Sequence, residues 1–212
     1  MAVMKMIGLQ FIADTFQMEY KSVAEKIGVS KQTFQDWIKG RRKIPLQRLQ
    51  QLSDLFGVNE VELFQKELTE SEKLEIQLFY FQKTDSVEDV DVPQIGEDGK
   101  EYFIKHTISQ NQNVIDYLYV RSKEVKLLEN VEHLITGLDP VNEANKETLS
   151  SVLQVLNSST KDKKTLEMVL FYLTEYQKED YWGGMLSQYS QYADKGFFEK
   201  FKNLLNEFGL SN

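Results

Sequence analysis

The order of apolar and polar positions between residues 20 and 45 predicts two short helices joined by a tight turn. The first helix has one apolar face, formed by Val23, Ala24 and Ile27. Gly28 follows this face, where a helix end favours a residue that takes left-handed backbone angles. Ser30 then stands at the N-cap position of the second helix. This spacing predicts a helix-turn-helix.

The second helix, residues 30–39, has two faces of opposite character. Its predicted buried face consists of Phe34, Trp37 and Ile38. Its other face carries hydrogen-bonding and charged side chains, namely Lys31, Gln32, Gln35, Asp36 and Lys39. Gly40 ends the helix, and a basic run follows at Arg41, Arg42 and Lys43.

DNA reading calls for such a polar helix followed by cations. The major groove admits one helix, and its base edges present donors and acceptors that amide and charged side chains can read. The sequence therefore predicts base contacts from Lys31, Gln32, Gln35 and Asp36. The basic run suits phosphates, which position a protein on DNA without reading its sequence. The predicted phosphate contacts on this ground are Lys39, Arg41, Arg42 and Lys43.

Two motifs carry a resemblance to a known family. The pattern A-E-K-I-G-V-S-K-x-T-F-x-x-W-I-x-G-x-R-x-I-P, followed by L-x-x-L-x-x-L-F-G-V, resembles the DNA-binding domain of lambda-repressor-like regulators of the xenobiotic-response-element family. The resemblance covers about residues 4–66 and implies a five-helix domain. Family members often carry a phosphate-contacting Gln at the start of the first motif helix. Tyr20 stands there instead, and its hydroxyl can also donate to a phosphate.

Further apolar stripes predict the remaining helices of this N-terminal domain, residues 1–68. A helix before the motif carries Leu9, Ile12, Ala13 and Phe16. After it, Pro45 suits the first turn of a helix whose stripe is Leu49, Leu52, Leu55 and Phe56. Val61 and Phe64 predict a short fifth helix. A Gly-turn-Ser junction alone occurs in many helical proteins, so the basic run and these flanking helices favour the DNA-binding interpretation.

The connecting segment, residues 69–110, gives mixed signals. Thr69 and Glu72 form a capping-box pattern, which predicts a helix. Apolar residues then alternate with polar ones between residues 74 and 81, which favours a strand, and the sequence leaves the two alternatives open. Farther on, alternating residues on both sides of an acidic turn at 96–99 predict a small β-hairpin. Glu97 and Asp98 of that turn lack the spacing of a calcium loop.

The C-terminal part, residues 111–212, is predicted to be mostly helical. A long helix over 113–136 repeats Val120, Leu127 and Leu134 every seven residues, with Val131 beside them and Glu124 interrupting. This is either a short coiled-coil seam or a helix packed within its own chain. Helices follow at 144–157, 161–177, 180–194 and 196–208, with a break at Asp139-Pro140. Eleven of the 25 aromatic residues lie between Phe171 and Phe208, as in either a core or a subunit interface.

Charge divides the chain into two parts, although its net charge is −8. Residues 1–66 hold 10 Lys and Arg against 7 Asp and Glu, a net charge of +3. The remainder holds 15 against 26, a net charge of −11. Only the first part is suited to approach a polyanion. We therefore expect the acidic part to face away from DNA.

Composition argues against other classes of protein. The chain has no Cys and two His without a matching carboxylate cluster, so we predict neither a metal site, nor a cofactor, nor an enzyme. The resemblance also implies a possible self-cleavage, because some repressors of this family cleave themselves at an Ala-Gly or Cys-Gly bond. The chain contains neither dipeptide. No membrane span or signal pattern is present, which predicts a soluble, cytoplasmic protein.

Together these features predict a mainly α protein that regulates transcription. An N-terminal helix-turn-helix domain would bind double-stranded DNA, and the C-terminal domain would form a homodimer or bind a protein or peptide effector. The predicted role is that of a repressor. The alternative is a protein-interaction adaptor in which the helix-turn-helix fold serves as a docking module.

Overall fold

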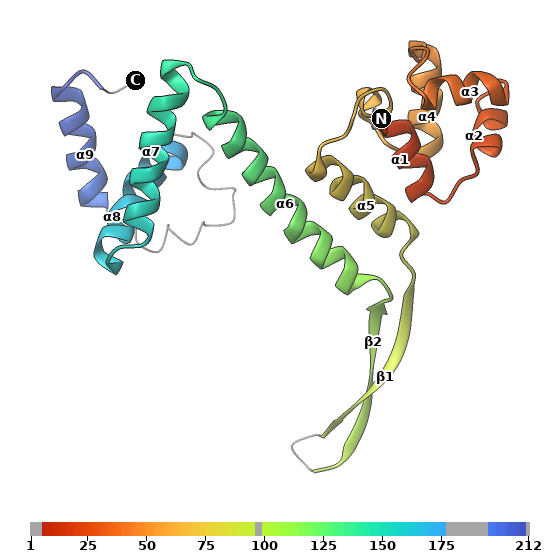
Figure 1. The fold of residues 1–212 in the computed structure, drawn as a ribbon. Coiled ribbons are helices and arrows are strands. Elements are labelled where there is room, and N and C mark those ends of the chain that lie inside the picture. The colour runs from red at the N-terminus through yellow and green to blue at the C-terminus, as the bar shows by residue number, and fades with distance from the viewer. Residues whose placement is uncertain (1–5, 96–98, 177–194, 211–212) are drawn as a thin grey trace. The chain divides into compact units, whose positions relative to one another are not determined.

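The protein is mainly α-helical, in agreement with the sequence prediction (Figure 1). A computed structural model describes residues 6–95, 99–176 and 195–210. The chain forms two compact units, Met1–His133 and Leu134–Asn212. The first unit contains the helix-turn-helix region, one further helix, a two-stranded hairpin and most of a long helix.

The first unit begins with four short α-helices and one 3-10 helix. In chain order they are α1 (Gly8–Thr15), α2 (Tyr20–Lys26), α3 (Lys31–Ile38), α4 (Leu46–Phe56) and the 3-10 helix η1 (Val61–Phe64). The first four confirm the helices predicted from the apolar stripes. The predicted fifth helix is a single 3-10 turn, because its four residues leave room for little more than one turn.

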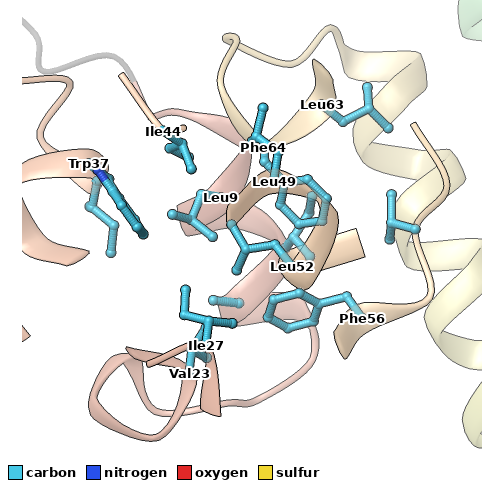
Figure 2. Packing of buried hydrophobic residues seen from close by; sticks show 14 of the residues in the cluster. Leu9, Val23, Ile27, Trp37, Ile44, Leu49, Leu52, Phe56, Leu63 and Phe64 are labelled. Atoms are coloured by element: carbon cyan, nitrogen blue, oxygen red, sulfur yellow. The ribbon is translucent and has the colours of Figure 1, made fainter. Parts of the chain in front are cut away.

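These elements close over one hydrophobic core (Figure 2). The side chains labelled in Figure 2 that meet there include Leu9 from α1, Val23 from α2, Leu52 and Phe56 from α4, and Phe64 from η1. The Phe56 ring lies 6.0 Å from the Phe64 ring and 5.2 Å from the Phe16 ring, centroid to centroid. The apolar stripes of the sequence therefore face one another, which fixes α2 and α3 on a rigid base.

Gly8 allows α1 to approach η1 at backbone distance. Its amide donates to the Lys66 carbonyl at 2.8 Å. A Cβ at this position would lie 1.7 Å from the carbonyl oxygen of Leu63. Only glycine fits this contact, which locks the two ends of the DNA-binding region together.

Residues 70–84 form one helix, α5 (Glu70–Thr84), which settles the choice between helix and strand for residues 74–81. Thr69 caps it as predicted, because its hydroxyl accepts from the Glu72 amide and the Glu72 carboxylate accepts from the Thr69 amide. The residues that pack against the rest of the domain follow helical spacing and not the alternation seen in the sequence. Ile76, Phe79 and Tyr80 instead present a helical face to the first four helices.

The α5 helix lies in the predicted connecting segment, residues 69–110, yet it packs on the N-terminal helices. Ile76 is part of the core cluster, and Phe79 packs against it. The Lys83 ammonium donates to the Phe56 carbonyl at 2.9 Å, which satisfies an acceptor at the end of α4.

The predicted hairpin is confirmed as an antiparallel pair, β1 (Val87–Ile95) and β2 (Glu101–Ser109). The register runs from Val87 opposite Ser109 to Ile95 opposite Glu101. Three residues of the predicted acidic turn, Gly96, Glu97 and Asp98, lie outside the described residues. The hairpin exposes large apolar side chains, namely Val87, Ile95, Tyr102, Phe103, Ile104 and Ile108. The register places Tyr102, Ile104 and Ile108 on one face of the hairpin and the other three on the opposite face. An isolated two-stranded sheet is marginal in water, so either apolar face would be stabilised by a partner.

The long helix α6 (Gln112–Ile135) follows the hairpin and lies within one residue of the predicted range. One of its faces contacts α5. The Glu129 carboxylate accepts from the amide of Ser71 at 3.1 Å and from its hydroxyl at 2.5 Å. Lys126 donates to the Glu75 carboxylate at 2.8 Å. Leu118 and Ser122 are buried on this face.

The heptad positions of α6 lie on the side of the helix opposite Leu118 and Ser122. Val120, Leu127 and Leu134 are all exposed, Leu127 at 64%. The interrupting Glu124 accepts from Arg121 one turn earlier at 3.0 Å. We call Val120, Leu127, Val131 and Leu134 the heptad seam.

The contact between Glu129 and Ser71 predicts a pH-dependent stability. Burial raises the pKa of Glu129, but hydrogen bonds from Ser71, Thr69 and the Glu70 backbone together outweigh it, so the pKa lies below its usual value of 4.5. The stabilisation is therefore present above that usual value and is lost as pH falls through the lowered pKa. We expect Glu129→Gln to reduce the free energy of unfolding by about 1 kcal/mol near pH 7, because one charged acceptor is lost. The deficit should shrink in acid.

Denaturant unfolding at several pH values measures this effect. Glu132→Gln is the matched control, because Glu132 is exposed on the same helix. Equal losses for the two variants, or a deficit for Glu129→Gln that is independent of pH, would contradict the role given to the Ser71 contact.

The second unit contains three α-helices among its described residues, α7 (Pro140–Leu156), α8 (Thr160–Phe171) and α9 (Lys195–Glu207), and a π-helical turn, η2 (Tyr172–Tyr176). The predicted break is confirmed, because α6 ends at Ile135 and α7 begins at Pro140. The helix predicted from residue 144 starts earlier, because Asp139 caps it and proline suits its first turn. The helix predicted at 180–194 lies outside the described residues. Phe171, Tyr172 and Phe198 are buried together, so these C-terminal aromatics form a core.

Candidate DNA-binding surface

The turn between α2 and α3 has the geometry that the sequence predicts. Gly28 takes a left-handed backbone conformation with φ of 69°. The amide of Val29 donates to the Ala24 carbonyl at 2.9 Å, which closes the end of α2. The Ser30 hydroxyl accepts from the Thr33 amide at 3.1 Å and caps α3. Both helices are thus fixed at their junction.

One face of α3 is buried in the core and the other is available to a ligand. Phe34, Trp37 and Ile38 are buried, as predicted, and the Phe34 ring lies 6.3 Å from the Trp37 ring. On the other face Lys31, Gln32 and Lys39 are exposed, while Gln35 and Asp36 are partly exposed. The structure therefore presents the predicted polar set on the outer surface of one rigid helix.

A Schellman motif ends α3, and the basic run follows it directly. Gly40 has a φ of 65°, and its amide donates to the Trp37 carbonyl at 2.8 Å. The Arg41 amide donates to the Asp36 carbonyl at 2.8 Å. Beyond the run, Ile44 is buried and its amide donates to Gln65 at 3.1 Å. The cations at 41–43 are exposed between these two anchored points.

Asp36 connects the polar face of α3 with the basic run. Its carboxylate accepts from the Gln32 amide at 3.2 Å. It also lies 3.6 Å from the Arg41 guanidinium and 3.9 Å from that of Arg42. The Asp36 side chain is only 14% exposed, whereas those of Arg41 and Arg42 are 62% and 68% exposed.

A hollow of about 560 Å³ lies among α1, α2 and α3. It is lined by Tyr20, Lys31 and Gln35, and also by Asp14 and Gln17. The Tyr20 hydroxyl donates to Asp14 at 2.7 Å. Burial, and next the hydrogen bond to Asp14, raise the pKa of Tyr20 to about 12. Tyr20 thus remains a neutral donor at physiological pH, and a phosphate would have to replace Asp14 as its acceptor.

The predicted site residues fall into two neighbouring groups. Tyr20, Lys31 and Gln35 border the hollow, and Gln32, Asp36, Arg41 and Arg42 form the second group. Lys39 ends α3, and Lys43 lines a second hollow of about 310 Å³ together with Arg42.

Sequence reasoning overlooked two residues of the hollow. Asp14 has no motif to mark it, because it lies in α1, six residues before Tyr20. Gln17 has a φ of 54°, which is rare for a residue other than glycine. Arg48 is one of the basic residues of this region, but its guanidinium makes contacts within the fold, because it donates to the Ile27 carbonyl and to Gln51.

These features define residues 20–44 as a helix-turn-helix with a basic extension. A helix-turn-helix family model matches residues 17–63, which include both motif helices, the basic run and α4. The match supports a DNA-binding regulator in general terms. No curated protein and no solved structure is significantly similar to the chain.

The described residues contain neither a metal-binding cluster nor a membrane-spanning helix. Within the described ranges, no group of three or more His, Asp or Glu side chains is arranged to hold a metal ion. No helix in the part of the chain that the structure covers is both long and apolar enough to cross a membrane.

Proposed function

We propose that this protein is a sequence-specific transcriptional regulator that binds double-stranded DNA as a dimer and acts as a repressor. The observation that carries the proposal is the arrangement of α3, which buries its aromatic face and presents Lys31, Gln32 and Gln35 outward beside a basic run. A helix presented in this way can lie in the major groove.

Each predicted residue has a place in this interface. The base-contacting residues are Lys31, Gln32, Gln35 and Asp36, all on the outer side of α3. The phosphate-contacting residues are Tyr20, Lys39, Arg41, Arg42 and Lys43, at the start of α2 and around the end of α3. Base contacts supply specificity, and phosphate contacts supply most of the affinity for any sequence.

The proposed dimer rests on the heptad seam of α6. Its leucines are exposed although they recur at coiled-coil spacing, and a second copy would bury them. Two recognition helices could then engage half-sites about 34 Å apart, one turn of the DNA helix.

Gln32→Ala tests the assignment of α3 to base reading. Gln32 lies near the N-terminus of α3, where a recognition helix meets the base edges. We expect the variant to lose about 1–3 kcal/mol of binding free energy for the preferred sequence, because one bidentate base contact is removed. Binding to unrelated DNA should change little.

Fluorescence anisotropy with a preferred and an unrelated duplex measures both affinities. Gln50→Ala on α4 is the control, because Gln50 makes the same type of hydrogen bond, to an Asp four residues on. An equal loss of affinity for both duplexes would remove Gln32 from base readout.

One observation favours a second candidate function. One face of the hairpin exposes Tyr102, Ile104 and Ile108, and exposed apolar side chains of this kind suit a protein partner. This surface favours a role in protein interaction, either in a regulator that also binds a protein or peptide effector or in an adaptor. The adaptor would in addition use its helix-turn-helix fold as a docking module. DNA affinity that falls steeply with salt separates the regulator from the adaptor.

A further inference from the structure

We infer that Asp36 is a positioning residue that holds Arg41 and Arg42 in the DNA-free protein, so that DNA phosphates must displace its carboxylate before these arginines can bind them. This inference rests on the proposed function and concerns how the same surface distinguishes its preferred sequence from other DNA.

The first support is geometric. Three side chains converge on the Asp36 carboxylate, namely Gln32, Arg41 and Arg42. The Schellman motif fixes the backbone of Arg41 to that of Asp36, so the arginine starts next to the carboxylate. Convergence leaves the Asp36 side chain largely covered while both guanidinium groups remain open to solvent.

The second support is the position of Asp36 within α3. It lies in the last turn of α3, where the negative end of the helix dipole disfavours a carboxylate. No basic side chain within that last turn offsets it. The two arginines beyond the helix offset this unfavourable charge, so the Asp36 carboxylate favours their staying beside it in the DNA-free protein.

Displacement of the Asp36 carboxylate from the two arginines has different consequences on the preferred DNA sequence and on other sequences. When phosphates take the arginines, the Asp36 carboxylate is left beside a polyanion and needs another donor. A cytosine amino group in the major groove can supply one, as the base-contact prediction for Asp36 requires. On DNA that lacks such a donor the carboxylate loses both ion pairs without replacement, which disfavours the complex. Asp36 thus lowers affinity for unmatched sequences.

Asp36→Asn tests the inference, because asparagine keeps the shape and an acceptor for Gln32 but removes the charge. We expect binding to an unrelated duplex to become about three- to tenfold tighter, as the loss of two exposed ion pairs allows. Affinity for the preferred duplex should rise less or fall, so the ratio of the two affinities should decrease.

Asp54→Asn is the matched control. Asp54 on α4 accepts from Gln50 four residues earlier, as Asp36 accepts from Gln32. The structure records no arginine contact to Asp54 among the described residues. A general effect of net charge would move both variants alike, which would overturn the inference.

A double-mutant cycle gives the decisive comparison. In an Arg41→Ala, Arg42→Ala background, Asp36→Asn should no longer tighten binding to unrelated DNA, since no arginine remains to be released. A gain that persists in this background would contradict the inference, and so would the absence of any gain in the wild-type background.

The proposed function can fail separately, if the wild-type protein binds no duplex. Arginine side-chain NMR relaxation of the DNA-free protein would then still decide the inference. Asp36→Asn should raise the mobility of the Arg41 and Arg42 side chains, and unchanged mobility would overturn the pairing.

Discussion

Replacing Arg41 and Arg42 together with alanine is expected to weaken binding to every duplex, preferred or unrelated. Both guanidinium groups are exposed next to the recognition helix and suit phosphate geometry. Each lost phosphate contact should reduce the slope of log affinity against log salt by about 0.9, or about 1.8 for each subunit. Near 0.15 M salt this corresponds to about a 30-fold loss of affinity for each half-site.

A salt titration of both duplexes measures the slope. The control is Lys200→Ala with Lys202→Ala, which removes the same charge from exposed positions on α9. An unchanged slope for the arginine variant, or an equal change for the control, would place Arg41 and Arg42 away from the DNA.

Leu127→Glu should convert the protein to a monomer and weaken binding to a duplex with two half-sites by about 100-fold, which is the lower end of the usual gain from two linked binding events. Leu127 lies at the centre of the heptad seam and is exposed in the single chain, so a charge there should spare the fold. In a dimer the same charge would be buried at the interface.

Sedimentation equilibrium gives the oligomeric state, and anisotropy gives the affinity. Leu153→Glu is the matched control, because Leu153 on α7 is 57% exposed, close to the 64% of Leu127. Affinity for a duplex with a single half-site should stay the same in all three proteins. A Leu127→Glu protein that still sediments as a dimer would move the dimer interface away from α6.

The sequence predicted the DNA-binding region well because local and tertiary preferences agree there. Gly28, Ser30 and Gly40 each mark a helix end, and the apolar stripes between them all face one core. The hairpin was likewise predictable, since a turn pattern separates two alternating runs.

Where a helix pattern and a strand pattern overlapped, the sequence did not determine the secondary structure. Residues 74–81 alternate like a strand, yet the capping box at Thr69 and the packing of Ile76 and Phe79 on the first four helices make them a helix. At Pro140 a residue that breaks helices starts one, because Asp139 satisfies the first amides of α7.

The sequence could place the candidate residues on one helix face and in one loop, but it could not show the contacts among them. Spacing placed Gln32 and Asp36 on one helix face. The approach of Arg41 and Arg42 to Asp36 depends on how the chain turns at Gly40, and the bond from Tyr20 to Asp14 joins two helices. Such contacts between separate elements follow from tertiary structure, which a periodic pattern does not specify.

Selection of duplexes from a random DNA pool by the intact protein tests the central claim most directly. If the protein is a dimeric regulator that reads bases through α3, the selected sequences should share a motif of two inverted half-sites with centres about 10 base pairs apart. Affinity for this motif should exceed that for unrelated DNA by at least about 10³-fold at physiological salt. Retention of no DNA, or of DNA without any shared sequence, would contradict the account.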